Sequence, residues 1–252
     1  MPFTVSHAAA VLPFLRTPLP AAALVVGAMA PDLPYFLPLG IAREFSHSLL
    51  GLVTIDLVVG VLVLLAWWFA LRAPVLDYSP GWLRNRMPEK HTGTALWMLA
   101  ALIIGGLTHL ALDTVTHEGS LDFVFPVLDE RPVDGIPFSY SNIIHGVASI
   151  IGAGIIAWWV RRWIARTPRR YVAVTINEYE RVITWIILGT IFGAVGIAAW
   201  LYGLTLGSHP LETHLLFMCF RWAASIAGVL ALGACVTWHV RKKVGDRVAV
   251  HR

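Results

Sequence analysis

The sequence predicts an all-α fold, a polytopic bundle of transmembrane helices with an additional N-terminal hairpin. Of its 252 residues, 57% are hydrophobic and 13% are charged, whereas about a quarter of the residues in a soluble domain are charged. The mean hydropathy is +0.70, and the apolar runs are long. Because these runs leave no room for a separate soluble domain, we expect residues 1–252 to form a single integral membrane domain.

Five apolar stretches approach or reach the roughly 20 residues that a helix needs to cross a hydrocarbon core of about 30 Å. None of them contains a proline, and each contains at most one Asp, Glu, Lys or Arg. We therefore predict five spanning helices, at Leu49–Leu71, Ala95–Thr116, Ile143–Val160, Val182–Leu206 and Phe217–Trp238.

The charges between the predicted helices alternate. The segments after the first and third helices are basic, as is the tail from Arg241, whereas the segment after the second helix is acidic. Basic segments remain cytoplasmic by the positive-inside rule. We therefore expect the acidic segment outside the cell and the C-terminus inside. Residues 161–252 would then form a cytoplasmic connector and two further transmembrane helices.

Residues 1–48 follow a different pattern. Two apolar stretches, 8–15 and 21–39, are interrupted by Arg16, Asp32 and several prolines. Proline breaks helices, and exposed backbone is not tolerated in lipid. We expect a re-entrant or interfacial helical hairpin that packs against the bundle and returns His7 and Asp32 to the outer side. The alternative, a sixth crossing through 21–39, would place His7 on the opposite face.

The net charge of +4 does not indicate a nucleic-acid partner, because the basic residues lie in short segments between apolar runs, where they orient the helices. Cys219 and Cys235 lack CxxC spacing. They predict neither a disulfide framework nor a thiolate metal site, and we expect them to fill the core.

Histidine and aspartate residues gather near the predicted outer face. His109 and Asp113 lie four residues apart, on one face of the second helix and about 6 Å apart along its axis. His117 follows one turn later, His47 precedes the first helix, and His145 lies in the first turn of the third. The charges of the loops alone gave the orientation, yet these five residues fall on the same side.

These residue types predict a metal site. Imidazole and carboxylate groups bind Zn²⁺, Mn²⁺ or Fe²⁺ where thiolates are absent, and a catalytic site keeps a position open for water. His109 and Asp113 can meet one ion, whereas His117, about 12 Å from His109 along the axis, would serve a second ion or lie outside the ligand shell. Any one of these histidines could instead be a hydrogen-bond partner between helices.

Two further residues adjoin this group. Ser48 follows His47, and Asp56 lies about two turns below it in the first helix, where it could orient a ligand. Ser48 lacks the Gly-x-Ser-x-Gly context of a nucleophile. A proton or ion path in a transporter is an alternative use of intramembrane His and Asp, but the polar residues do not continue to the other face.

Five motifs stand in order along roughly residues 1–160: MPFTVSHAAAVLPF, GAMAPDLPYF, SHSLLG, GLTHLALDTVTHEG and IIHGVASIIG. Together they closely resemble an uncharacterised bacterial membrane family known as a domain of unknown function. That family is in turn similar to the membrane-bound metal-dependent hydrolases. The resemblance implies a multi-pass protein of the bacterial plasma membrane whose first 160 residues carry the metal site.

A more distant similarity is to the zinc-dependent phospholipase C and P1 nuclease superfamily, all-helical enzymes that cleave phosphate esters with a zinc cluster. It implies that Asp113 bridges two metals. The chain departs from that pattern at Ser149, where the superfamily has Glu, so we expect a mononuclear or dinuclear site. The implied metal ligands are His7, Asp32, His47, His109, Asp113, His117 and His145.

We therefore expect a membrane-embedded metal-dependent hydrolase that acts at the outer leaflet on a phosphoester, such as a phospholipid or a lipid-linked phosphate. Zn²⁺ is the expected metal, with Mn²⁺ or Fe²⁺ as alternatives, and Asp32, His47 and Asp113 would take part in catalysis. Arg43 and Arg131 would bind the phosphate, because guanidinium matches its oxygens in a fork. The alternative is a metal-binding membrane protein without turnover, either a transporter or an assembly partner.

Overall fold

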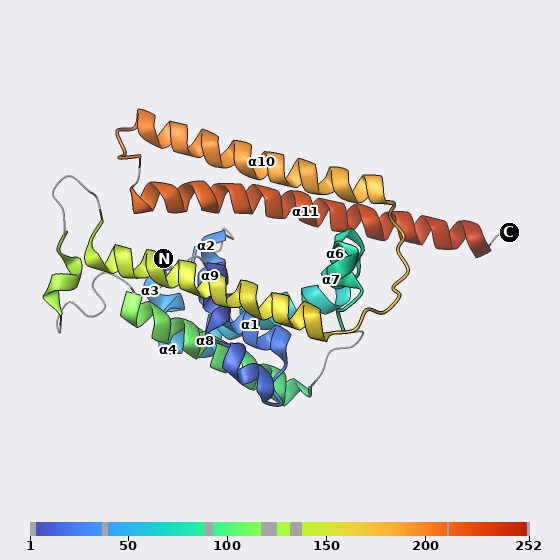
Figure 1. The fold of residues 1–252 in the computed structure, drawn as a ribbon, viewed down its shortest axis with the longest axis horizontal. Helices are drawn as coiled ribbons and strands as arrows, with labels where there is room; N and C mark the ends of the chain where they lie inside the picture. Colours follow the sequence, from blue (N-terminus) through green and yellow to red (C-terminus); the bar gives the residue numbers. More distant parts are fainter. Residues whose placement is uncertain are drawn as a thin grey trace.

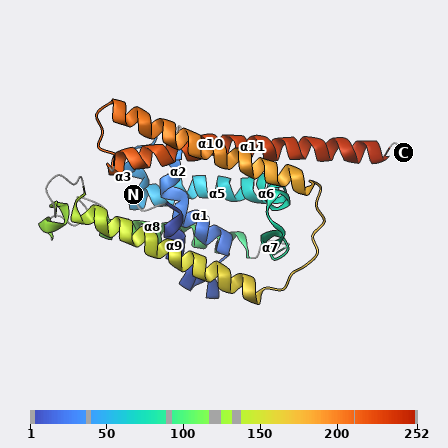
Figure 2. The ribbon, with the colours of Figure 1, turned by 45° about the horizontal axis from the view of Figure 1, so that its top comes forward.

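The structure is a computed structural model that describes residues 4–36, 40–88, 93–116, 125–131, 138–210 and 212–250. These residues form helices joined by turns and extended connections, without a strand. Figure 1 shows the long helices running lengthwise, with α10 (Glu178–Thr205) and α11 (Thr213–Val250) side by side along one edge of the molecule. The turned view in Figure 2 shows the same pair beside the remaining helices. The all-α prediction is confirmed.

Five of the described helices are long and apolar enough to cross a membrane. The first, Leu49–Tyr78, is continuous through α4 (Leu49–Gly51), the π-helical η4 (Leu52–Asp56), α5 (Leu57–Ala66), the π-helical η5 (Trp67–Leu71) and α6 (Arg72–Tyr78). The others lie in α8 (Ala95–Thr116), α9 (Tyr140–Arg166), α10 and α11. The protein is therefore a multi-pass membrane protein, as the sequence predicted.

Three helices continue beyond their predicted apolar ends. The predicted ends are Leu71, Val160 and Trp238, whereas the helices end at Tyr78, Arg166 and Val250. A helix satisfies its own backbone hydrogen bonds in lipid and in water alike, and long basic side chains can extend toward water while their stems cover apolar surface. The predicted connector at 161–170 is therefore helical as far as Arg166.

The N-terminal hairpin is formed by short helices. It contains η1 (Thr4–Ala9), η2 (Leu12–Arg16), α1 (Ala21–Met29), η3 (Ala30–Asp32) and α2 (Leu33–Phe36). The apolar stretch Ala21–Phe36 is shorter than the five candidate spans, and α1 packs against α8 while η1 packs against α9. Thr4 Oγ1 donates a hydrogen bond to Asp32 Oδ2 at 2.7 Å, so the two ends of the hairpin meet. The expected hairpin is confirmed in place of a sixth crossing.

The α1 and α8 helices touch backbone to backbone. A Cβ added to Gly27 would overlap the carbonyl oxygen of Leu102, and one added to Gly105 would overlap that of Leu24. Small residues allow this close approach between membrane helices. Leu24 and Leu102 are themselves buried in the hydrophobic core beside the contact. The contact fixes the end of α1, and with it η3, against the middle of α8.

Polar and aromatic contacts hold the α10–α11 pair to the rest of the chain. The carboxylate of Asp77 in α6 accepts hydrogen bonds from the Thr175 backbone N–H (3.1 Å) and from Trp238 Nε1 (2.6 Å). At the other end, the Tyr35 ring lies edge-on to Phe217, with 5.9 Å between centroids. The pair is thus attached near both of its ends.

We predict that Gly105→Ala lowers the free energy of unfolding by about 1–3 kcal/mol, because the new methyl group forces α1 and α8 apart. Gly154→Ala in α9 is the control, because nothing lies within 4 Å of a Cβ added there. It should be neutral or stabilising by about 0.5–1 kcal/mol. Thermal unfolding in detergent, followed by circular dichroism, measures both. Equal stability of the two variants would contradict the close contact.

Candidate metal centre

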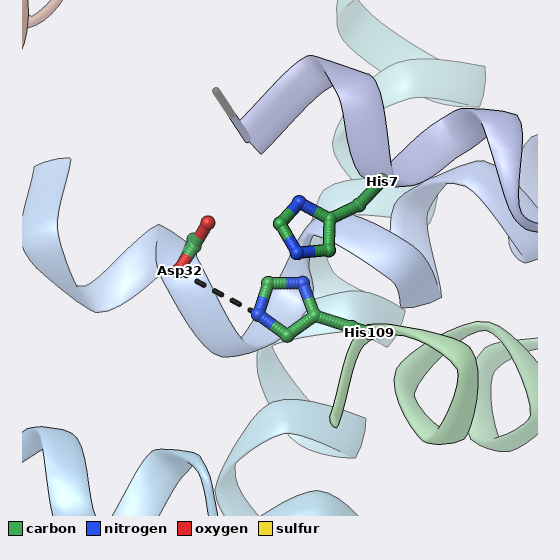
Figure 3. Close-up of side chains that lie close together, drawn as sticks. All are labelled: His7, Asp32 and His109. Carbon is green, nitrogen blue, oxygen red and sulfur yellow. Dashed lines mark ion pairs between the residues drawn. The ribbon is translucent and has the colours of Figure 1, made fainter. Parts of the chain in front are cut away.

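Five buried or largely buried side chains converge at one end of the bundle. His7 comes from η1, Asp32 from η3, and His109 and Asp113 from α8. His47 stands between α3 (Arg43–Ser46) and the first spanning helix. Figure 3 shows His7, Asp32 and His109 directed toward one another from three segments that are distant in sequence. We call His7, Asp32, His47, His109 and Asp113 the cluster.

Backbone carbonyl groups orient the two central imidazoles. His109 Nδ1 donates to the Ala28 carbonyl oxygen at 2.8 Å. His47 Nδ1 donates to the Arg43 carbonyl oxygen at 3.2 Å and lies 3.0 Å from the Ser46 hydroxyl. Because a carbonyl oxygen can only accept, Nδ1 carries the proton in each neutral ring, and Nε2 presents its lone pair to the cluster. This arrangement, a ligating ring fixed through its other nitrogen, is typical of histidine metal ligands.

The inward-facing atoms have the separations of ligands around one small cation. His47 Nε2, His109 Nε2 and Asp113 Oδ2 form a triangle with sides of 3.4, 3.6 and 3.3 Å. Asp32 Oδ1 lies 3.4 Å from His47 Nε2 and 3.7 Å from His109 Nε2. Two ligands about 2.0–2.2 Å from a tetrahedral zinc ion would stand roughly 3.3–3.6 Å apart. The cluster therefore matches the spacing of a zinc site.

Asp113 connects both sides of the cluster. Its Oδ2 faces His47 and His109, and its Oδ1 accepts a hydrogen bond from His7 Nε2 at 3.2 Å. The His7 ring stacks on the His109 ring, with centroids 4.0 Å apart and planes 17° apart. Arg43 Nη2 lies 3.4 Å from Asp113 Oδ2. A second group of nearby ligand atoms comes from His7, Asp32 and His109.

Two buried polar atoms of the cluster have no hydrogen-bond partner among the described residues. They are His7 Nδ1 and Asp32 Oδ1. The other oxygen of Asp32 is held by Thr4, which leaves Oδ1 directed at the two Nε2 atoms. A buried acceptor without a hydrogen bond costs about 1–3 kcal/mol or more when charged. A bound cation would remove that cost, so the residues present fit a metal ion.

The charges of the cluster act on His47. Burial lowers the pKa of His47, but the carboxylates of Asp113 and Asp32, 3.3 and 3.4 Å from its Nε2, outweigh burial and raise this pKa to about 9. For Asp32, burial raises the pKa, but the nearby imidazoles of His47 and His109 and the hydrogen bond from Thr4 give a net lowering. In the protein alone, a proton on His47 thus partly balances two carboxylates. A divalent cation would take over this role and release that proton.

Two other predicted site residues, His145 and Arg131, are described by the structure but are not among the five residues of the cluster. His145 is buried in α9 but belongs to neither group of ligand atoms. Arg131 is exposed after η6 (Pro126–Asp129), and no ion pair is recorded between it and the cluster among the described residues. His117 lies outside the described residues. These predicted roles stay predictions.

The two residues expected to support the ligands differ in their surroundings. The Ser48 hydroxyl accepts from the Gly51 N–H at 2.9 Å and donates to the Phe45 carbonyl oxygen at 2.8 Å, so it caps the first spanning helix. Asp56 is 1% exposed, and neither of its carboxylate oxygens has a hydrogen-bond partner among the described residues. It stands in η4, which packs against α8 and η3.

Sequence reasoning missed three supporting groups, those of Thr4, Ser46 and Tyr35. Thr4 holds Asp32, and Ser46 contacts His47 Nδ1. The Tyr35 ring centroid lies 6.0 Å from that of His47, and its hydroxyl is buried without a partner among the described residues. The only signal in the sequence is proximity: Ser46 adjoins His47, and Thr4 and Tyr35 each stand three residues from a predicted ligand.

Comparison with known proteins gave one match. The model of a family described as Domain of unknown function (DUF4184) matches residues 1–237. No curated protein and no solved structure matches the chain. The family match agrees with the resemblance to an uncharacterised family and extends beyond the roughly 160 residues that carried it, into α11.

We predict that the purified chain binds about one or two equivalents of zinc, and that His109→Asn weakens binding more than about a hundredfold, because it removes a ligand and its orienting hydrogen bond. His239→Asn is the control, because His239 contacts the Ala70 carbonyl oxygen, in the first spanning helix near the end opposite the cluster. Elemental analysis and competition with a chelating dye measure both. Equal zinc content in the two variants would show that the cluster is a hydrogen-bonded network.

Proposed function

We propose that this chain, which belongs to the DUF4184 family, is a membrane-embedded metal-dependent hydrolase that acts on a phosphoester. One observation carries the proposal. Two imidazole Nε2 atoms 3.4 Å apart, both within 3.3–3.7 Å of two different carboxylates, face a common point. That donor set, three or four oxygen and nitrogen ligands without thiolate, is typical of catalytic zinc, with Mn²⁺ or Fe²⁺ as alternatives.

A zinc ion in such a site would supply a bound water that ionises near neutral pH. The ion itself would polarise a phosphoryl oxygen. The protein contributes the remaining functions. His47, His109 and Asp113 would hold the ion, and the superfamily resemblance implies that Asp113 would also serve a second one. Asp32, fixed by Thr4 through one oxygen, would accept a proton from the attacking water at the other.

Arg43 would bind the phosphate. Its guanidinium lies 3.4 Å from Asp113 Oδ2, and its side chain is 38% exposed, so it reaches from the cluster toward the outside. Arginine binds phosphate oxygens through paired N–H groups. Among the described residues, Arg131, the other predicted clamp, makes no such contact.

The surroundings of the cluster favour a lipid substrate. Phe45, Leu49 and Leu50 flank His47 in sequence, and each is a large hydrophobic residue with 41–68% of its surface exposed. The cluster lies at the end of the spanning helices, near the level of lipid headgroups. A phospholipid or lipid-linked phosphate could place its phosphate at the cluster while its chains stay in the bilayer. By the positive-inside rule, the charges of the loops favour the outer leaflet of a bacterial plasma membrane for this end.

The resemblance to the zinc-dependent phospholipase C and P1 nuclease superfamily supports the phosphoester class, because its motifs assign ligand roles to all five cluster residues. The alternative is a metal-binding protein without turnover, such as a transporter. Beneath the cluster, Gly27, Gly105 and Leu102 pack together tightly in the hydrophobic core. This packing favours a closed site over a path through the membrane.

We predict that the zinc-loaded chain in detergent hydrolyses a chromogenic phosphodiester or a phospholipid, with product release followed by absorbance or mass spectrometry. Asp32→Asn should lower kcat by about a hundredfold or more, because it removes the proposed proton acceptor. His239→Asn should have no effect. A chain that binds zinc but hydrolyses neither substrate class would instead support a metal-binding role without turnover.

For Arg43→Gln we predict a kcat/KM about ten- to a hundredfold lower with zinc content unchanged, because a hydrogen bond to a charged group contributes about 1.5–3 kcal/mol. Arg131→Gln, assayed in parallel, removes one positive charge from the same predicted outer side. It therefore distinguishes loss of a phosphate contact from loss of positive charge in general. Equal losses in the two variants would assign the effect to general charge and contradict a direct clamp at Arg43.

A further inference from the structure

A cavity of about 700 Å³ lies at the end of the bundle opposite the cluster. Trp67 and Arg72 in its wall belong to the first spanning helix, whose start adjoins His47. The 20 residues from His47 to Trp67 span about 30 Å at 1.5 Å per residue, the thickness of a hydrocarbon core. The cavity and the cluster therefore face opposite leaflets.

The wall of this cavity is apolar and rich in tryptophan. Its apolar parts come from α1, the first spanning helix, α7 (Gly81–Arg84), the start of α8 and the end of α9. Arg72 is the one charged residue among the described residues that line it. The tryptophans that line it are Trp67, Trp68, Trp82, Trp159 and Trp163.

Three arginines surround the segment that closes the cavity, which contributes Met87 and Pro88 to its wall. Arg72 Nη2 donates to the Pro88 carbonyl oxygen, and Arg170 Nη2 donates to that of Met87. Arg86 Nε donates to the carbonyl oxygens of Ile164 and Thr167 at 3.0 Å. The guanidinium groups of Arg72 and Arg170 thus lie beside backbone that lines the apolar cavity.

The apolar wall, the tryptophans and the nearby arginines together indicate which kind of ligand fits the cavity. The wall favours a hydrocarbon chain, the indole rings suit the boundary between headgroups and chains, and basic side chains attract anionic headgroups. The volume is within the roughly 300–1,000 Å³ of ligand sites. A helix about 10 Å wide would fit for fewer than roughly two turns, so a partner helix is a poor occupant. We propose that the cavity binds an acyl chain of an anionic glycerophospholipid, with its phosphate near Arg72 and Arg170.

This site is independent of the metal centre, and tryptophan fluorescence can test it directly. The full chain is reconstituted in phosphatidylcholine vesicles that contain increasing fractions of phosphatidylglycerol with brominated acyl chains, which quench nearby indoles. Brominated phosphatidylcholine at the same fractions is the reference. We expect saturable quenching, with half-saturation at a fraction about fivefold lower for phosphatidylglycerol, the effect of one basic side chain on an anionic lipid.

Two variants with matched controls locate the effect. Val25→Phe fills the cavity, and Val58→Phe makes the same change at a 54% exposed position outside it. Arg72→Gln removes a guanidinium that lies 5.3 Å from the Trp68 ring, and Arg162→Gln removes one that lies 5.4 Å from the Trp158 ring outside the cavity. Circular dichroism verifies the fold of each variant.

The proposal requires that Val25→Phe removes the saturable quenching and that Arg72→Gln removes the preference for phosphatidylglycerol, while both controls behave like the native chain. Equal quenching by the two lipids, or losses of the same size in the controls, would overturn it. Zinc content and hydrolysis should be unchanged in Val25→Phe, so failure of this site and failure of the metal centre are distinguishable.

Discussion

The contact between α1 and α8 is the constraint on which the cluster depends. Gly27 and Gly105 let the two backbones touch, and Ala28, next to Gly27, accepts the hydrogen bond that orients His109. Asp32 follows one turn beyond α1, so the same contact places its carboxylate opposite His109. A small change in this spacing would change the distance between the Asp32 carboxylate and the His109 imidazole, because the position of both depends on α1.

Burial makes the cluster sensitive to charge. Asp32 and Asp113 are removed from water together, and two buried carboxylates repel each other unless positive charge lies between them. His7 and Arg43 touch Asp113, and His47 takes a proton when no other cation is present. These partners offset the charge only in part, since one oxygen of Asp32 keeps no hydrogen bond within the described residues. A divalent cation, as proposed, would offset this charge more completely than any side chain of the cluster.

Much of the fold could be read from the sequence, because bilayer thickness and backbone hydrogen bonding determine it. Five spans and a proline-broken hairpin follow from those two constraints, and the pair His109 and Asp113 follows from the period of one helix. Ser46 and Ser48 both adjoin His47 in the sequence, but the sequence could not show that Ser46 contacts the imidazole while Ser48 caps a helix, since the two side chains point in different directions. Nor could it show that His145 stands outside the ligand groups, because that depends on how α9 packs against η1. Local periodicity thus predicts which residues share a face, and only tertiary packing decides which faces meet.

The last two helices connect the two ends of the molecule. Near the cluster, α11 packs against the hairpin through the contact between Phe217 and Tyr35; at the opposite end it is joined to α6 through Trp238 and Asp77. The family model includes the contact between Tyr35 and Phe217 and ends at residue 237, one residue before Trp238. Because α2 adjoins η3, which carries Asp32, the position of α11 bears on the cluster although it supplies no ligand. The α10–α11 pair is therefore better understood as a support that holds the hairpin in place than as an independent membrane anchor.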